Sequence, residues 1–122
     1  MKLIPDTLQG PSIQAYGPGW IGVSGQKHSG GLLVSSQYGV QAWDVQQFSD
    51  LDLHHMEALG NMGAEIIILG TGQQLRWVPA PWMAKLGQKR VGLECMDTGA
   101  ACRSYNFLMA EGRKVIAALL PL

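Results

Sequence analysis

The residues best suited to chemistry lie between Asp97 and Asn106, where a cysteine and an arginine are adjacent. Cys102 follows the turn-like segment 97–99, and we expect it in the first turn of a helix. There the helix dipole and the Arg103 guanidinium would lower the thiol pKa and make Cys102 a nucleophile or a redox thiol. The competing interpretation is a buried structural thiol, because Asp97 opposes thiolate formation and no histidine is placed as a partner. We favour the structural interpretation, since free cysteines usually behave as small hydrophobic residues.

Two glycine-containing loops, 70–72 and 97–99, each follow the carboxyl end of a predicted buried strand. If these strands are parallel neighbours, both loops open onto one crevice, the usual ligand site of an open α/β sheet. The helix N-terminus at the second loop would attract an anion. Neither loop is a phosphate motif, because the third glycine of a dinucleotide fingerprint and the Gly-Lys-Ser/Thr of a P-loop are absent. Simple turns and a helix cap are the alternative. The predicted binding crevice comprises Gly70, Thr71, Gly72, Asp97, Thr98, Gly99, Cys102, Arg103 and Asn106.

Other titratable residues give weaker signals. His54 and His55 diverge by about 100° on a helix and cannot bind one metal ion together. No Asp/Glu/His cluster has metal-ligand spacing, so the sequence predicts no metal site, no cofactor and no catalytic residue apart from the weak candidate Cys102. Glu94 lies in a predicted buried strand and would need Arg103 or Lys114 as an ionic partner.

Aromatic residues mark a second candidate surface. Trp77 and Trp82 flank the proline-rich segment 78–81. Such an extended loop with aromatic residues at both ends suits contact with another protein. Packing of the loop onto the domain itself is equally compatible with the pattern.

The elements that position these residues begin with a β-rich half. Residues 1–12 are expected to form an irregular arm broken by Pro5, Gly10 and Pro11. Strands are predicted over residues 13–16, 20–23, 31–35 and 41–43. A Gly-Pro-Gly turn at residues 17–19 joins the first two strands into a hairpin.

The second half alternates strands and helices. A helix is predicted over residues 51–59, with Ser49 or Asp50 as its N-cap and Gly60 as its end. The β-branched run 65–69 is apolar on both faces and indicates a central strand covered on both sides. The remaining predictions are a short strand or extended segment at 75–78, a helix at 82–87, a strand at 91–96, a helix at 98–111 and, in preference to a helix, a buried strand at 115–120.

Length and composition restrict the class of protein. The 122 residues are enough for one domain, and 47% of them are hydrophobic. The formal net charge is zero, which argues against binding to nucleic acid and gives little repulsion against weak self-association. No apolar run is long enough to cross a membrane, and we expect no signal peptide. With only two cysteines, the pattern indicates free thiols in the cytoplasm.

Four segments resemble one widespread family of small α/β domains: residues 16–21, 68–72, 96–106 and 110–113. The family includes the mitochondrial respiratory complex I assembly factor, the adipogenesis-associated vertebrate protein and many uncharacterised bacterial and archaeal proteins. The resemblance covers nearly the whole chain, although Ser104 stands where threonine is expected. It implies a three-layer single α/β domain over residues 1–122, with a mixed central sheet of about five strands and an additional N-terminal β-hairpin region. It also implies that the last strand runs antiparallel to most others, and it implies no established enzymatic activity and no cofactor.

These observations favour a non-enzymatic binding or assembly module that holds a protein partner at the predicted crevice. The best-understood relative binds partners during assembly of a membrane-bound respiratory complex, so the resemblance implies a related role for a cytoplasmic, bacterial-type member. The alternative is an anion-binding or small-molecule enzyme or sensor that uses Cys102 as a reactive thiol. In a third interpretation, the segment from Asp97 to Asn106 is purely architectural.

Overall fold

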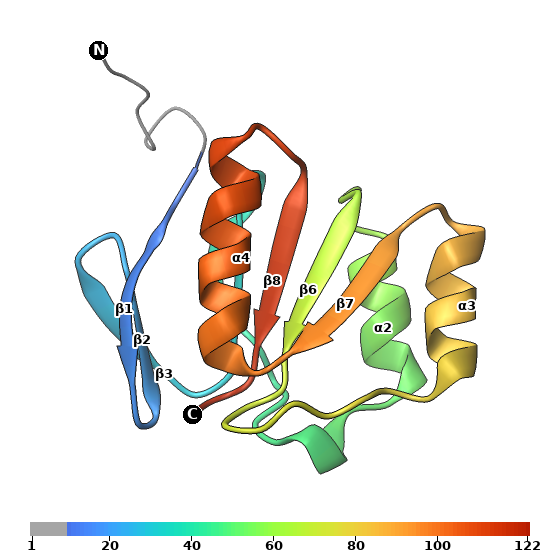
Figure 1. Ribbon diagram of the computed structural model, residues 1–122, viewed down its shortest axis with the longest axis horizontal. Coiled ribbons are helices and arrows are strands. Elements are labelled where there is room, and N and C mark those ends of the chain that lie inside the picture. The colour runs from blue at the N-terminus through green and yellow to red at the C-terminus, as the bar shows by residue number, and fades with distance from the viewer. Residues whose placement is uncertain (1–9) are drawn as a thin grey trace.

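The apolar run Ile66–Gly70 forms strand β6, which lies inside a five-stranded sheet of order β5-β4-β8-β6-β7 (Figure 1). The computed structural model describes residues 10–122. Ile67 and Ile68 point to opposite faces of the sheet and enter two separate hydrophobic cores, as the doubly apolar pattern predicts. The other strands of this sheet are β4 (Leu32–Ser35), β5 (Gly39–Ala42), β7 (Gly92–Met96) and β8 (Val115–Leu119).

The strand directions differ from those that the resemblance implies. Strand β8 is parallel to β6, and β6 is parallel to β7, whereas β4 is antiparallel to both β8 and β5. The expectation that the last strand runs against most others is therefore wrong, because β4 is the strand that does so. The reason is connectivity: a tight turn reverses the chain between β4 and β5, while helical crossovers return it in the same direction between β6, β7 and β8.

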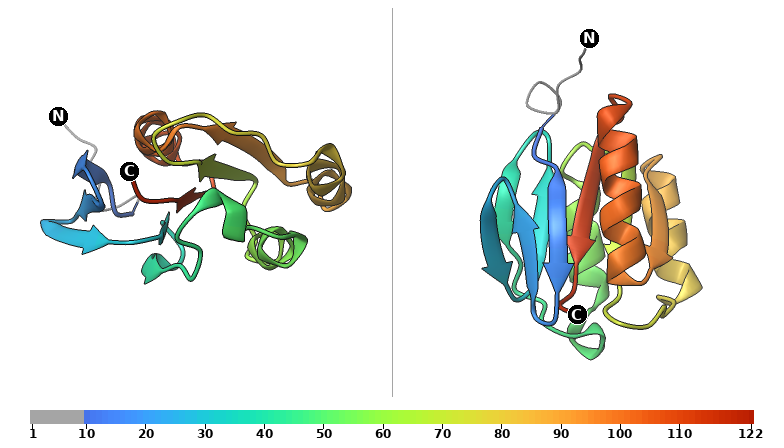
Figure 2. Two further views of the ribbon diagram at one scale, coloured as in Figure 1. Left: turned by 90° about the horizontal axis from the view of Figure 1, so that it is seen from below. Right: turned by 60° about the vertical axis from the view of Figure 1, so that its left-hand side comes forward.

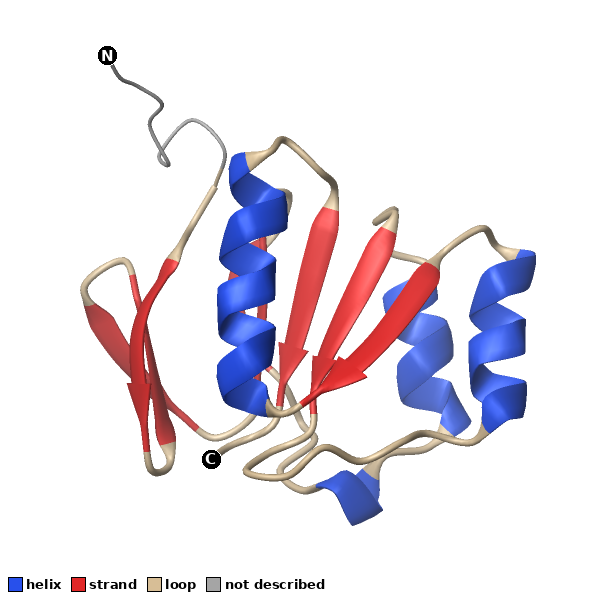
Figure 3. Ribbon diagram, in the orientation of Figure 1, coloured by secondary structure: helices blue, strands red, loops and turns tan. Residues whose placement is uncertain are grey.

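Helices and a second sheet cover the two faces of the central sheet (Figures 2 and 3). One face carries α2 (Leu53–Gly60) and α3 (Ala80–Gln88). The other face carries α4 (Thr98–Ala110) together with a three-stranded antiparallel sheet at the N-terminal side. The predicted three-layer α/β arrangement is confirmed. The strands of the N-terminal sheet are β1 (Ile13–Gly17), β2 (Trp20–Val23) and β3 (Gln26–Ser29).

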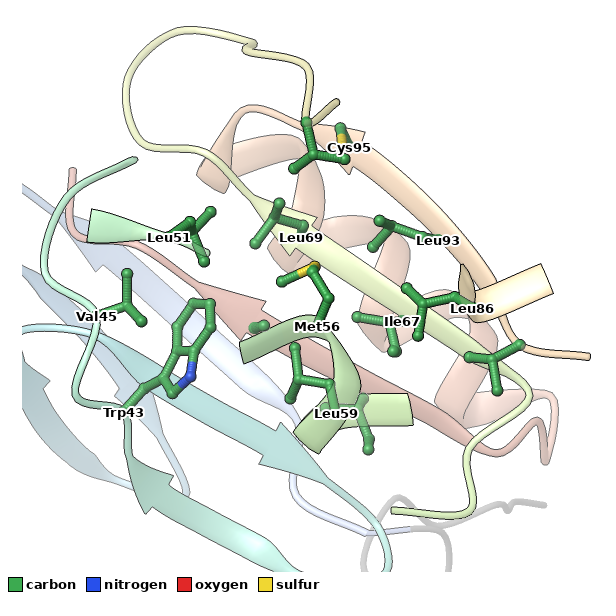
Figure 4. Close-up of a cluster of buried hydrophobic side chains, with 14 of the residues drawn as sticks. Trp43, Val45, Leu51, Met56, Leu59, Ile67, Leu69, Leu86, Leu93 and Cys95 are labelled. Atoms are coloured by element: carbon green, nitrogen blue, oxygen red, sulfur yellow. The ribbon is translucent and has the colours of Figure 1, made fainter. Parts of the chain in front are cut away.

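Both faces bury apolar side chains. On the first face, Met56 and Leu59 of α2 and Leu86 of α3 pack on the sheet (Figure 4). On the second face, Tyr105 of α4 is fully buried beside Ile21 of the N-terminal sheet. The two cores fix α4 and the ends of β6, β7 and β8 relative to one another, and these elements form the candidate site.

Several predicted boundaries shift. Strand β3 was not predicted, because its residues Gln-Lys-His-Ser are polar and largely exposed. The strand predicted at residues 41–43 is β5, and Trp43 lies beyond its end as a buried core residue. Residues 75–78 form no strand. Of the predicted N-terminal arm, residues 1–9 lie outside the described part, and residues 10–12 are in neither a helix nor a strand.

The N-terminus of α2 also differs from the prediction. Ser49 and Asp50 lie in a short 3-10 helix, η1 (Phe48–Asp50), and neither caps α2. Asp52 is the N-cap instead: its carboxylate accepts a hydrogen bond from the backbone N–H of His55 at 3.3 Å. The Nδ1 atom of His55 accepts from the backbone N–H of Asp52 at 3.1 Å, which completes a capping box. The structure thus gives His55 a role in helix capping.

Candidate functional site

The two predicted loops meet at the carboxyl edge of the central sheet. Strands β6 and β7 pair in parallel with Gly70 opposite Met96, so the loops leave the sheet side by side. The backbone N–H of Thr71 donates to the carbonyl of Met96 at 2.9 Å, and that of Thr98 donates to the carbonyl of Gly72 at 2.8 Å. The predicted neighbourhood of the two loops is confirmed.

Thr98 holds this junction together from the inside. Its side chain is fully buried, and its hydroxyl donates to the carbonyl of Leu120 and accepts from the N–H of Gly72, both at 2.8 Å. A Cβ atom at Gly70 would lie 2.9 Å from Thr98 Oγ1 and 3.0 Å from Thr98 Cα, so this close approach requires glycine. These hydrogen bonds join the two loops to each other and to the segment after β8.

The N-terminus of α4 is occupied by the chain itself. Asp97 is the N-cap, and its carboxylate accepts from the backbone N–H of Ala100 at 2.9 Å. The N–H of Thr98 is already bonded to Gly72. An anion at this helix end would meet the negative charge of Asp97 and would find two of the donors in use. The capping alternative fits this geometry better than an anion site.

Cys102 differs from the hypothesis of a reactive thiol in both position and pKa. Because α4 begins at Thr98, Cys102 lies in its second turn, and the residue is only 2% exposed. Burial raises the pKa of the thiol to about 12, which outweighs the lowering by Arg103, and Asp97 raises it further. The predicted depression of this pKa is wrong. Burial likewise raises the pKa of Cys95, against a smaller lowering by a hydrogen bond from the backbone of Val78.

The polar flank of α4 faces the first strand of the chain. Asn106 accepts from the N–H of Ile13 at 2.8 Å and donates to the carbonyl of the same residue at 2.7 Å. Nη1 of Arg103 donates to the hydroxyl of Tyr16 at 2.7 Å. Gly99 lies directly against the side chain of Tyr16, since an added Cβ atom at Gly99 would be 2.9 Å from the Tyr16 hydroxyl oxygen. Arg103 and Asn106 therefore bond the N-terminal sheet to α4.

A pocket of about 540 Å³ does open beside the junction, and we call it the carboxyl-edge pocket. Of the nine predicted residues, only Thr71 and Gly72 line it. Glutamine side chains dominate the wall, and Arg76 supplies the charge. Sequence reasoning missed the segment 46–49 as part of a pocket, because it has neither a motif nor a periodic pattern, and it considered Ser49 only as a helix cap. The lining residues are Gln46, Gln47, Phe48, Ser49, Thr71, Gly72, Gln73, Gln74, Arg76, Leu120, Pro121 and Leu122.

Apolar side chains are exposed next to this pocket, on the loop that follows β6. Trp77 is 66% exposed and Leu75 is 47% exposed. The loop is nevertheless held in place, because the Thr71 hydroxyl donates to the carbonyl of Gln74 at 2.7 Å and accepts from the N–H of Arg76 at 3.1 Å. Residues 75–77 are called the display loop below. Trp82, the second aromatic residue of the predicted contact surface, instead packs against the core.

Arg76 connects the display loop to the carboxyl-edge pocket. Its guanidinium carbon lies 6.0 Å from the centre of the Phe48 ring, within the range of a cation–π contact. Phe48 belongs to η1, so this contact ties the loop to a segment far away in sequence. Within residues 10–122 no group of three or more His, Cys, Asp or Glu side chains is arranged to hold a metal ion. No helix in the same range is long and apolar enough to cross a bilayer.

Comparison with known proteins gives the following matches. The family model described as "Protein of unknown function (DUF498/DUF598)" matches residues 13–120. An uncharacterized protein of Rhodobacter capsulatus is 36% identical over 110 residues, which are 90% of this chain and 84% of that protein. NADH dehydrogenase (ubiquinone) 1 alpha subcomplex assembly factor 3 of Xenopus tropicalis is 29% identical over 122 residues. That match covers 98% of this chain but 66% of the factor, slightly less than two thirds of its length.

The fold is also that of a solved structure. A crystal structure of a protein from Bordetella parapertussis superimposes with a TM-score of 0.86 at 34% sequence identity. The superposition covers 92% of this chain and 96% of that one, so the two structures share the central sheet and its surrounding layers.

Proposed function

Because the chain belongs to the DUF498/DUF598 family and has an assembly factor among its relatives, we propose that it is a non-enzymatic protein-binding domain that assists the assembly of a protein complex. The observation that carries this proposal is the display loop, which exposes Leu75 and Trp77 on a backbone fixed by Thr71. By analogy with the Xenopus factor, the complex is a membrane-bound one. Two free buried cysteines suit work in the reducing cytoplasm.

The display loop has the properties of a binding anchor. A tryptophan buries a large apolar area while fixing only two side-chain torsions, so its entropic cost on binding is small. Since Thr71 already holds the loop, binding would not have to order the backbone, and less of the contact energy would be lost. Tryptophan and arginine are also enriched among residues that dominate the binding energy of interfaces. Trp77 and Arg76 therefore form the centre of the proposed contact.

The carboxyl-edge pocket supplies the surrounding polar surface. The amides of Gln47, Gln73 and Gln74 can both donate and accept hydrogen bonds, as the rim of a protein interface requires. The amide of Gln46 already bonds the backbone of Gly31 and Trp43. Arg76 is the charged side chain of its wall. A partner segment that fits this surface places an apolar side chain against Trp77 and Leu75 and places polar or acidic groups beside Arg76.

A crosslinked pull-down from the native cell tests the proposal through matched variants. We expect Trp77→Ala and Arg76→Gln to reduce capture of a specific partner by about tenfold or more, the usual size of a central interface residue. The control is Tyr38→Ala, because Tyr38 is 48% exposed on the turn between β4 and β5, away from the display loop. Capture that is equal for all four proteins, or absent for the wild type, contradicts the proposal.

A second function, binding of a small anion, is favoured by one observation. The volume of the carboxyl-edge pocket, about 540 Å³, lies in the usual range of small-molecule sites, and Arg76 provides a positive charge. Native mass spectrometry of the purified protein would detect a retained ligand, and Arg76→Gln should release it. Cys102 has no part in this alternative, because it is buried in the core beneath α4.

A further inference from the structure

The central sheet has an uncovered strip on the face that carries α4. Helix α4 packs mainly on β6 and β8, and the N-terminal sheet lies beyond it, so no helix of residues 10–122 lies in front of the edge strand β7 (Figure 1). Leu93 and Cys95 of β7 point into the core on the opposite face. Glu94 points toward the uncovered strip and is exposed. The predicted buried ion pair of Glu94 is therefore wrong, because this part of the strand lies at the surface.

A groove of about 470 Å³ runs along this strip between α4 and β7, and we call it the α4–β7 groove. The half-buried Ile66 and Leu108 supply its apolar lining, while Ile68 is only 1% exposed. Phe107 stands at its margin and is 63% exposed, one of the most exposed large apolar residues of the described chain. The full lining is Ile66, Ile68, Glu94, Arg103, Ser104, Phe107, Leu108 and Arg113.

The charges of the groove are only partly satisfied within the chain. Nε of Arg113 lies 2.8 Å from a carboxylate oxygen of Glu65, so this guanidinium is neutralised. Arg103 donates from Nη1 to the neutral hydroxyl of Tyr16, which leaves its charge unbalanced and its other N–H groups available to a carboxylate. Among residues 10–122, Glu94 makes no ion pair within 4.0 Å. Within the described part of the chain, Arg103 and Glu94 thus have no ionic partner within 4.0 Å on this surface.

This surface carries both halves of a contact. Arg103 and Phe107 are one helical turn apart on the exposed side of α4, so they project together. The groove beside them offers an apolar lining for an aromatic ring and a carboxylate for a guanidinium. A surface that holds a projecting group and its complementary recess can pair with a copy of itself about a two-fold axis.

We propose that two copies of this chain associate through the α4–β7 groove. Phe107 of each copy enters the groove of the other, and Arg103 of each copy faces Glu94 of the other. Every contact then occurs twice, and the two phenylalanine rings pack near the axis, where offset aromatic pairs are favourable. A net charge of zero adds no long-range repulsion between the copies. The groove and the carboxyl-edge pocket share no residue, so the pair would leave the display loop accessible.

Analytical ultracentrifugation over a concentration series up to about 1 mM, where weak interfaces become populated, tests this proposal. We expect the wild type to shift from monomer to dimer and Phe107→Ser to weaken dimerisation by about tenfold or more. Tyr38→Ser is the matched control, because it also removes an exposed aromatic ring but lies on a distant turn. A wild type that stays monomeric, or a Phe107→Ser variant that dimerises as well as the wild type, overturns the proposal.

A charge exchange identifies the contact itself. Glu94→Arg and Arg103→Glu should each weaken self-association, because each places like charges opposite one another across the axis. When the two variants are mixed in equal amounts, both charge pairs become favourable again, so a mixed dimer should form at the wild-type level. Failure of the mixture to exceed either variant alone would show that Glu94 and Arg103 do not face each other, and would overturn the proposed geometry. A partner protein bound at the groove in place of a second copy would be insensitive to the mixing.

Discussion

The Thr98 junction joins the loops that follow β6 and β7, whereas the display loop belongs to the segment that follows β6 alone. The two regions use their polar groups in opposite ways. At the junction, the side chain of Thr98 is turned inward and both of its hydrogen bonds go to the backbone of the same chain. In the display loop, the internal hydrogen bonds fix the backbone, and the side chains of Leu75 and Trp77 face the solvent. Thr71 lies between the two regions and stabilises the second.

This comparison shows that the residues most suggestive of chemistry in the sequence are structural. A threonine, an aspartate and a cysteine next to glycines are typical of a ligand loop, but here the threonine joins strands, the aspartate caps a helix and the cysteine fills a core. The display loop contains no motif. The sequence indicated a contact surface at Trp77 and Trp82, and the structure shows that Trp77 and Leu75 are exposed while Trp82 packs against the core.

The largest loss of stability that distinguishes the junction from the display loop should come from Thr98→Val. The substitution keeps the shape of the side chain but leaves the N–H of Gly72 and the carbonyl of Leu120 without their partner in a buried site. We expect unfolding in urea to show a loss of about 2–6 kcal/mol, since each of the two unsatisfied buried groups costs about 1–3 kcal/mol.

Thr98→Ser is the control for that experiment. Serine keeps the hydroxyl and loses only a methyl group, so its cost should be about 1 kcal/mol. If valine and serine destabilise the protein equally, the hydrogen bonds of Thr98 do not stabilise the junction, and its contrast with the display loop disappears.

Much of the fold could be predicted because hydrophobic period and turn residues are local signals. The β-branched run 65–69 correctly predicted β6, and the Gly-Pro-Gly turn correctly predicted the hairpin of β1 and β2. Strand β3 could not be predicted, because an exposed strand of polar residues has no apolar alternation. The direction of β8 could not be predicted either, since an all-apolar strand reads the same in both orientations.

The candidate site was less predictable, because it depends on contacts between distant segments. The rule that neighbouring parallel strands end at the same edge of a sheet correctly predicted that loops 70–72 and 97–99 lie side by side. The sequence could not show that Asn106 would bind the backbone of Ile13, 93 positions away, or that the segment 46–49 would complete a pocket. Exposure of Trp77 and burial of Cys102 are likewise consequences of the whole packing.

A smaller loss of stability should appear at alkaline pH, because the thiol of Cys102 ionises there. Its pKa is raised in the folded protein from the ordinary value of 9.0 to about 12, so the protonated thiol is favoured by folding. The contribution to stability is therefore fully present below pH 9.0 and is lost as the pH rises toward about 12. The limiting slope is about 1.4 kcal/mol per pH unit.

Thermal or urea unfolding of wild type and Cys102→Ala between pH 8 and pH 11 measures this contribution, since the ordinary thiol pKa of 9.0 lies in this window. We expect the alanine variant to be less stable at pH 8 but to lose less stability as the pH increases. Tyr105, whose pKa is also raised by burial, is present in both proteins and cancels in the comparison. Parallel pH profiles for the two proteins would indicate that Cys102 ionises freely in the folded state, as a reactive thiol would.

The smallest effect on stability should come from the display loop, where Leu75→Ser tests the other half of the comparison. Leu75 is 47% exposed and lies outside both core clusters, so its replacement should change the free energy of unfolding by no more than about 0.5 kcal/mol. The same variant should reduce partner capture, because it removes apolar surface next to Trp77. A loss above about 1 kcal/mol would mean that Leu75 packs against the domain. The loop would then be structural like the Thr98 junction, and the protein-binding role would lose the observation on which it rests.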